Sequence, residues 1–149
     1  MADWMETYRG AVLGGEYDAE SHMNTAIYVS RFDQATWFLL SSVGITPALM
    51  RQRGRRIAMV RQAAQYLREL RGGQLLTVES GFVAVGRKHL RFQHRMFDVE
   101  SRALVASSDC TAVQASLKTG RSVVMPAGQR QAAEGLLVTA NVAGATGLD

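Results

Sequence analysis

The chain has 149 residues, of which 47% are hydrophobic, so it can bury the core of one domain and is too apolar for wholesale disorder. No apolar run reaches the roughly 18 residues of a membrane span, and the N-terminus lacks the basic and continuous apolar regions of a signal peptide. The lone cysteine, Cys110, cannot form an internal disulfide, so we expect a cytoplasmic protein. The length and the short apolar runs predict one domain with no membrane segment.

The net charge of +4 comes with 17 basic residues, of which only Lys88 and Lys118 are lysines. Arginine binds phosphate through paired hydrogen bonds, so this bias fits an anionic ligand, and it fits the codon usage of a GC-rich genome equally well. The cations are spread along the chain, with one cluster at Arg51–Arg56, and no nucleic-acid-binding motif is present. We therefore expect no nucleic-acid partner.

The first expected strand covers Glu6–Glu16, where apolar side chains alternate with glycines that weaken the pattern. A polar loop follows at Tyr17–Met23. Acid–base groups crowd this loop and its end: Asp18, Glu20, His22 and Asn24. Such groups leading into a helix are what attack on a carbonyl needs, because a helix start presents unpaired N–H donors and a positive dipole end.

A helix is expected from Thr25 to Ser42, with Asn24 or Ser21 as its N-cap. Its apolar residues recur at spacings of three and four over a wide arc, which predicts a helix covered on most sides. Gly44 suits the residue just past a helix end, and a short second helix is expected at Pro47–Arg53.

Four further segments are rich in β-forming residues, and turn sequences separate them. We expect strands at Ile57–Leu70, Gln74–Val85, His89–Asp98 and Leu104–Leu117. The first of these also has the composition of a helix. The third alternates best, with one face made of Leu90, Phe92, His94 and Met96. Three successive hairpin-like turns, the first at Arg71–Gly73, predict an antiparallel meander.

The simplest packing of these elements is an α+β domain in which the antiparallel sheet wraps around the long helix. With no linker or internal repeat, we expect a single domain over residues 1–149, with its core at about 6–126. The tail, 127–149, is expected to form a short helix at Gln129–Leu137 or to be loosely ordered.

The pattern D-x-x-x-H-x-N, entering a long helix and followed by strands, resembles the hotdog-fold acyl-CoA thioesterases, in particular the 4-hydroxybenzoyl-CoA thioesterase-like branch. The resemblance covers about Tyr8–Pro126. It is carried by residues 16–18, 22–24, 28–29 and 32–35, with support at 66–68, 73–75, 88–90 and 106. Residues 68–72 and 92–95 are similar to thioesterase domains linked to carnitine breakdown.

The resemblance implies hydrolysis of an acyl-CoA to a free acid and CoA, with no cofactor. It also implies a homodimer or a homotetramer, in which two sheets pair edge to edge and active sites lie at the dimer interface.

For the site, the resemblance implies that Asp18 is the nucleophile or the general base and that the Thr25 N–H is the oxyanion donor. Taken alone, Asp18 would be an ordinary turn or N-cap aspartate. His22 could orient Asp18, bind substrate, protonate the leaving thiolate or be structural. Asn24 is expected to be the N-cap of the helix rather than a ligand contact. Glu20 departs from the family pattern and could raise the pKa of Asp18, serve as an alternative base or face solvent.

Other residues are candidates for the catalytic, CoA-binding or pocket-lining roles. Asp33 is the only acid in the helix and lies too far from its start, so Asp18 is preferred. Arg87 and Lys88 occupy a turn where relatives place basic residues on the CoA phosphates. Trp37 and Tyr66 could line an acyl pocket or belong to the core. The scattered histidines predict no metal site.

Three alternatives remain at this stage. One is hydration of an enoyl-CoA, which the four-residue spacing of Asp18 and His22 disfavours. Another is a non-catalytic acyl-CoA-binding protein of the same fold. A third is a thioesterase that takes its substrate from an acyl carrier protein.

Overall fold

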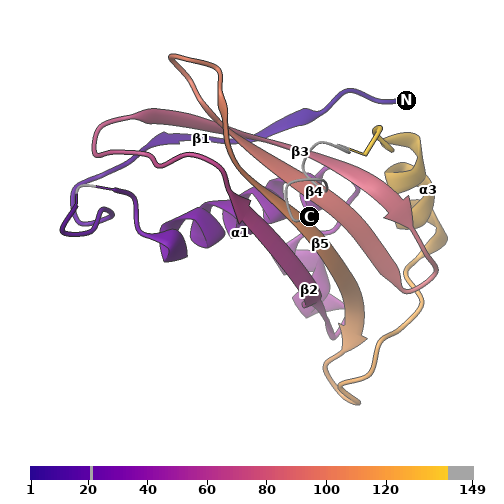
Figure 1. Ribbon diagram of the computed structural model, residues 1–149. Helices are drawn as coiled ribbons and strands as arrows, with labels where there is room; N and C mark the ends of the chain where they lie inside the picture. Colours follow the sequence, from indigo (N-terminus) through magenta and orange to yellow (C-terminus); the bar gives the residue numbers. More distant parts are fainter. Residues whose placement is uncertain (21, 141–149) are drawn as a thin grey trace.

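A single antiparallel sheet curves around one long helix in this chain (Figure 1). The structure is a computed structural model, and it describes residues 1–20 and 22–140. The strands are β1 (Met5–Ala11), β2 (Arg55–Tyr66), β3 (Leu75–Val85), β4 (His89–Asp98) and β5 (Leu104–Ser116). The helices are α1 (Thr25–Ser41), α2 (Pro47–Gln52) and α3 (Ala127–Gly135). The expected α+β architecture is confirmed.

The strand order is β1-β3-β4-β5-β2, so the expected meander holds for β3, β4 and β5 only. Strand β2 does not pair with β3. It lies at the far edge, antiparallel to β5, from Arg55 opposite Ser116 to Tyr66 opposite Ala106. The turn at Arg71–Gly73 therefore joins no hairpin. A turn sequence shows that the chain reverses, but it does not show which strand the next segment joins.

Two strands, β1 and β2, end four or more residues before the predicted end. Strand β1 stops at Ala11 because the chain turns at Gly15, whose φ of 85° favours glycine. Strand β2 stops at Tyr66, after which the N–H groups of Leu67 and Arg68 both donate to the Val105 carbonyl. Helix α3 begins slightly before its predicted start at Gln129, and residues 141–149 of the predicted tail lie outside the described part.

Helix α1 begins and ends as predicted but is covered on one face only. Asn24 is its N-cap, and Gly44 follows its end with a φ of 83°. The other N-cap candidate, Ser21, lies outside the described residues. The sheet buries Phe32 completely, whereas Phe38 on the opposite face is 60% exposed. The prediction of a helix covered on most sides is wrong for a single chain, because one sheet covers only one face.

Below the helix, β4 has the predicted alternation, and Leu90, Phe92, His94 and Met96 are all buried. The His94 ring stacks on Phe32 and lies between the hydroxyls of Ser80 and Thr36, with Nε2 2.8 Å from Thr36 Oγ1. Burial lowers the pKa of His94 to about 3, so the ring is neutral at physiological pH. None of the described helices is long and apolar enough to cross a membrane.

Candidate active site

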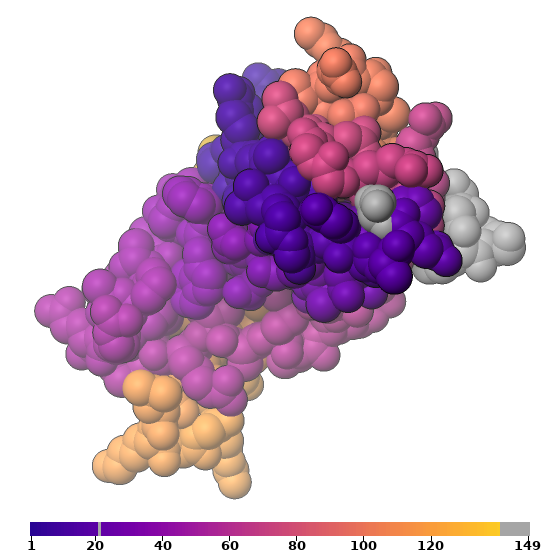
Figure 2. Space-filling model, turned by 90° about the vertical axis from the view of Figure 1, so that its left-hand side faces the viewer, coloured from indigo at the N-terminus to yellow at the C-terminus, as the bar shows by residue number. Residues whose placement is uncertain are grey.

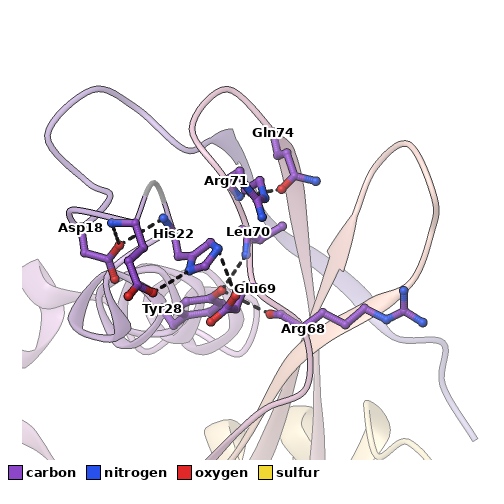
Figure 3. A network of polar contacts seen from close by, with 9 residues as sticks. Asp18, His22, Tyr28, Arg68, Glu69, Leu70, Arg71 and Gln74 are labelled. Atoms are coloured by element: carbon purple, nitrogen blue, oxygen red, sulfur yellow. Dashed lines mark hydrogen bonds and ion pairs between the residues drawn. The ribbon is translucent and has the colours of Figure 1, made fainter.

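The loop between β1 and α1 folds back on itself and against the segment that follows β2 (Figures 2 and 3). Within the loop, the Asp18 N–H donates to the His22 carbonyl at 2.8 Å. Across the gap, the Met23 N–H donates to the Leu70 carbonyl at 2.6 Å. These backbone bonds bring two segments that are distant in sequence to the same end of the sheet.

A nearly buried ion pair fixes the same loop to α1. The Arg31 guanidinium on the helix contacts the Glu16 carboxylate, and only 9% and 17% of the two side chains is exposed. The hydrogen bond from the Leu13 N–H, with Arg31 beside it, holds the pKa of Glu16 below its usual value. The loop is therefore held at both of its ends, which is what an active-site loop needs to keep its groups in position.

Asp18 makes the turn that the sequence alone suggests. Its Oδ1 accepts hydrogen bonds from the Glu20 N–H at 2.8 Å and the His22 N–H at 3.2 Å. Among the described residues, none donates to its second oxygen, Oδ2. One oxygen thus holds the turn, and the other remains for chemistry.

Among the described residues, the start of α1 leaves one backbone donor without a partner. Asn24 accepts from the Ala26 N–H through its side chain at 3.0 Å and from the Ile27 N–H through its carbonyl at 2.9 Å. Thr25 is the first helical residue, and its N–H has no acceptor within the helix. Asn24 therefore acts as the predicted N-cap, and the Thr25 N–H is the amide of this turn that a ligand can use.

His22 does not point its ring at the Asp18 carboxylate. Its Nε2 lies 3.1 Å from a Glu69 carboxylate oxygen, and its Nδ1 lies 3.8 Å from Glu20 (Figure 3). The ring thus sits between two carboxylates, and His22 supports Asp18 through its backbone N–H instead. The Glu20 side chain is 80% exposed, as the solvent-facing alternative requires. Glu69 was missed because no local pattern links it to His22.

These groups share one cavity of about 550 Å³. Its walls come from the loop, the first turn of α1 and the end of β2: Asp18, His22, Met23, Asn24, Thr25, Tyr28, Tyr66, Leu67, Arg68 and Glu69. Tyr66 therefore lines the cavity, as a residue of an acyl pocket would, although a place in the core was also considered. Trp37 instead packs against the core around Leu39 and Phe82.

Tyr28 and Tyr66 form an aromatic corner in this cavity. Their ring centroids are 5.3 Å apart, and their planes meet at 75°. The Tyr28 hydroxyl accepts from the Leu70 N–H at 3.1 Å and donates to the Arg68 carbonyl at 3.4 Å, which fixes the ring. Burial raises the pKa of Tyr28, so this hydroxyl stays neutral.

Arg87 and Lys88 lie at the other end of the sheet, in the exposed turn between β3 and β4. The Asp18 loop lies at the opposite end of β3, where the Val12 N–H donates to the Gln74 carbonyl. Strand β3 has 11 residues and separates the two ends by roughly 35 Å. One chain therefore does not bring these two cations to Asp18. In the described part of the chain, no cluster of three metal-ligating side chains occurs.

Comparison with known families matches residues 12–133 to the model of the thioesterase-like superfamily. A relative from Agrobacterium fabrum, named L-carnitine dehydrogenase/betainyl-CoA thioesterase, is 29% identical over 122 residues. That alignment covers 82% of this chain but only 25% of the relative.

Solved structures resemble the fold closely. A Staphylococcus aureus protein, SAV2348, determined in complex with CoA, aligns with a TM-score of 0.85 at 18% identity, over 95% of this chain and 90% of that one. The 1,4-dihydroxy-2-naphthoyl-CoA thioesterase Slr0204 from Synechocystis aligns with a TM-score of 0.77 at 15% identity, over 87% and 95%. The predicted hotdog fold is confirmed.

Proposed function

Because this chain belongs to the thioesterase-like superfamily, we propose that it hydrolyses an acyl-CoA to a free acid and CoA. The observation that carries the proposal is that Asp18 and Thr25, the first residue of α1, both line one cavity. A carboxylate with an unbonded oxygen can attack a carbonyl or activate water, and a free helix N-terminal amide can accept the resulting negative charge.

In the proposed reaction, the thioester carbonyl oxygen faces the Thr25 N–H, and Asp18 Oδ2 faces the carbonyl carbon or a water molecule beside it. With Asp18 as general base, the carboxylate takes a proton from water as the oxygen bonds to carbon. The C–S bond then breaks, and the CoA thiolate takes a proton to leave as the thiol. The protonated Asp18 carboxyl can return the proton it took, directly or through His22, which lies between Glu20 and Glu69.

The expected size of each role follows from general values for enzymes. A positioned general base contributes about 10²–10⁴-fold to a rate. One oxyanion donor is worth about 3–4 kcal/mol in the transition state. Neither role needs a cofactor, and water is the co-substrate.

A second copy of the chain is part of the proposal. Strand β2 is the edge strand on one side of the sheet, and nearby Val60, Tyr66 and Leu67 are 46–59% exposed. Antiparallel pairing of two β2 edges would satisfy their open hydrogen-bonding groups. It would also carry the distant end of the partner sheet, with its Arg87–Lys88 turn, toward this cavity. Whether those cations meet CoA phosphates stays a prediction.

The test is Asp18→Asn in a hydrolysis screen over aromatic, short, medium and long acyl-CoA substrates, with a thiol-reactive dye reporting free CoA. The Asn side-chain oxygen can still accept from the Glu20 and His22 N–H groups, so the turn should persist. We expect kcat/KM to fall by about 10²–10⁴-fold.

Asp98→Asn is the matched control, because Asp98 also accepts two backbone N–H bonds, from Glu100 and Ser101, in a turn outside the cavity. Full activity in Asp18→Asn would refute the role of Asp18. Binding of acyl-CoA by the unmodified protein without thiol release would favour the non-catalytic alternative. The acyl group and the choice between CoA and a carrier protein are left to the screen.

A further inference from the structure

The cluster Arg51–Arg56 is the densest group of cations in the sequence, and the proposed reaction does not use it. No aspartate or glutamate occurs between Asp33 and Glu69, so the cluster has no acidic neighbour along the chain. Arg51 and Arg53, at the end of α2, are exposed, and neither forms an ion pair within the described part of the chain. These two guanidinium groups are therefore available to an acidic group outside the chain.

Helix α2 lies on the same side of the sheet as α1 (Figure 1). Its Met50 is buried in the same core cluster as Leu39 of α1. The candidate cavity is also on this side, because the first turn of α1 supplies part of its wall. Helix α2 directly precedes β2, which begins at Arg55. Arg51 and Arg53 therefore lie at the start of the edge strand, on the side of the sheet that carries the cavity.

Two exposed carboxylates lie at the other end of β2. Glu69 comes shortly after Tyr66, the last residue of β2, and its side chain is 69% exposed. The Glu20 side chain is 80% exposed and lies 3.8 Å from the opposite side of the His22 ring. The guanidinium of Arg68 extends away from His22 and Glu69 (Figure 3). Within the described part of the chain, the His22 ring is the only group that forms an ion pair with either carboxylate.

Antiparallel pairing of two β2 edges would bring these opposite charges together. In such a pair, the start of one β2 lies beside the end of the other. A two-fold axis perpendicular to the joined sheet keeps the α1 sides of both copies on one face. The exposed end of the partner's α2 then lies beside the cavity wall at Tyr66–Glu69. Because the interface is symmetric, the same contact occurs twice.

We propose that, in a pair of copies, the partner's Arg51 and the partner's Arg53 form ion pairs with Glu20 and Glu69. This inference rests on the β2 pairing in the proposed function and names the contacts that the partner adds to the same site. The cavity of one chain is therefore incomplete, since its exposed carboxylates receive their counter-charge from the partner. A CoA thioester is itself a polyanion, so this counter-charge also lowers the repulsion that the substrate meets at the cavity.

The experiment exchanges the charges of the two sides. One variant carries Arg51→Glu with Arg53→Glu, and the other carries Glu20→Arg with Glu69→Arg. The dissociation constant of the dimer is measured by sedimentation equilibrium for each protein alone and for an equimolar mixture of the two variants. Each variant alone places like charges in both copies of the contact. A mixed pair has opposite charges in both copies, with their positions exchanged.

We expect each variant alone to dimerise about tenfold more weakly, or worse, which is the scale of several exposed ion pairs acting together. The mixture should dimerise nearly as tightly as the unmodified protein. Arg87→Glu with Lys88→Glu is the matched control. It makes the same charge change at the same end of the sheet, but β4 and β5 separate that turn from the β2 edge. At physiological salt, which screens distant charges, this control should keep the dissociation constant.

The unmodified protein provides a second measurement that needs no variant. Raising the salt concentration from about 50 mM to about 500 mM should weaken its dimer, because salt screens exposed ion pairs. A mixture as monomeric as its two components would overturn the inference, and so would a dimer that is insensitive to salt. An unmodified protein that stays monomeric would overturn it too. These results concern association alone, so they leave acyl-CoA hydrolysis to the test with Asp18→Asn.

Discussion

Acid should destabilise this protein through His94, a residue far from the chemistry. The ring is fully buried among Phe32, Phe92 and the hydroxyls of Ser80 and Thr36, with no carboxylate in contact among the described residues. Burial lowers its pKa to about 3, whereas an unfolded chain has a histidine pKa of about 6.5. Between these two values the unfolded state binds a proton that the folded state does not.

The sign and size of the effect follow from this difference. The free energy of unfolding is unaffected by His94 above about pH 6.5 and falls as the pH is lowered toward 3. Each pH unit in that window costs about 1.4 kcal/mol, so at pH 5 the loss is about 2 kcal/mol. This is a sizeable fraction of the roughly 5–15 kcal/mol that stabilises a typical domain.

The measurement is urea unfolding of the unmodified protein and of His94→Gln at pH 7.5 and pH 5.0. A Gln amide can donate to one of the two hydroxyls and accept from the other, but it does not titrate. The carboxylates whose pKa is lowered, such as Asp98 and Asp109, lose stabilisation equally in both proteins. We expect the unmodified protein to lose about 2 kcal/mol more than the variant. Equal losses would refute a neutral, desolvated His94.

Two further predictions concern the support of the site. Asn24→Ala removes the acceptor for the Ala26 N–H and should lower the free energy of unfolding by about 1 kcal/mol, seen as a fall in Tm of about 2–4 °C. Asn24→Asp should keep the cap, and an unchanged Tm in Asn24→Ala would count against a stabilising cap. Arg31→Met leaves the Glu16 carboxylate without its partner and should lower the free energy of unfolding, measured in urea, by about 3–5 kcal/mol. The double variant with Glu16→Gln should recover part of this loss, and additive losses would contradict a coupling between Arg31 and Glu16.

Features that depend on near neighbours in the sequence could be predicted. Asn24 before an apolar run and Gly44 after it mark the two ends of α1, because capping uses residues next to the helix. The alternation of β4 was predictable because the sheet buries one side of that strand. The edge position of β2 was not, because its pairing with β5 joins residues about 40–60 positions apart and leaves no local pattern.

The candidate site shows the same division. Asp18, Asn24 and Thr25 lie within eight consecutive residues, so a turn followed by a helix cap was enough to suggest their grouping. Glu69 reaches the site only because the segment after β2 crosses to pair with the loop at Met23. Tyr28 was quoted only as part of the family pattern, and nothing in its spacing showed that its hydroxyl would bind that crossing segment.

The position of Arg87 and Lys88 argues that one chain holds only part of the substrate site. The cavity beside Asp18 contains the groups that could act on a thioester, but the basic turn lies at the other end of β3. A free β2 edge on the sheet offers the pairing that would bring the two ends of different copies together. If the copies do pair in this way, a substitution that breaks the pairing should raise KM for the CoA thioester while leaving the Asp18 turn intact. A monomer with full affinity for CoA would instead point to Arg68, which already borders the cavity, as the phosphate-binding cation.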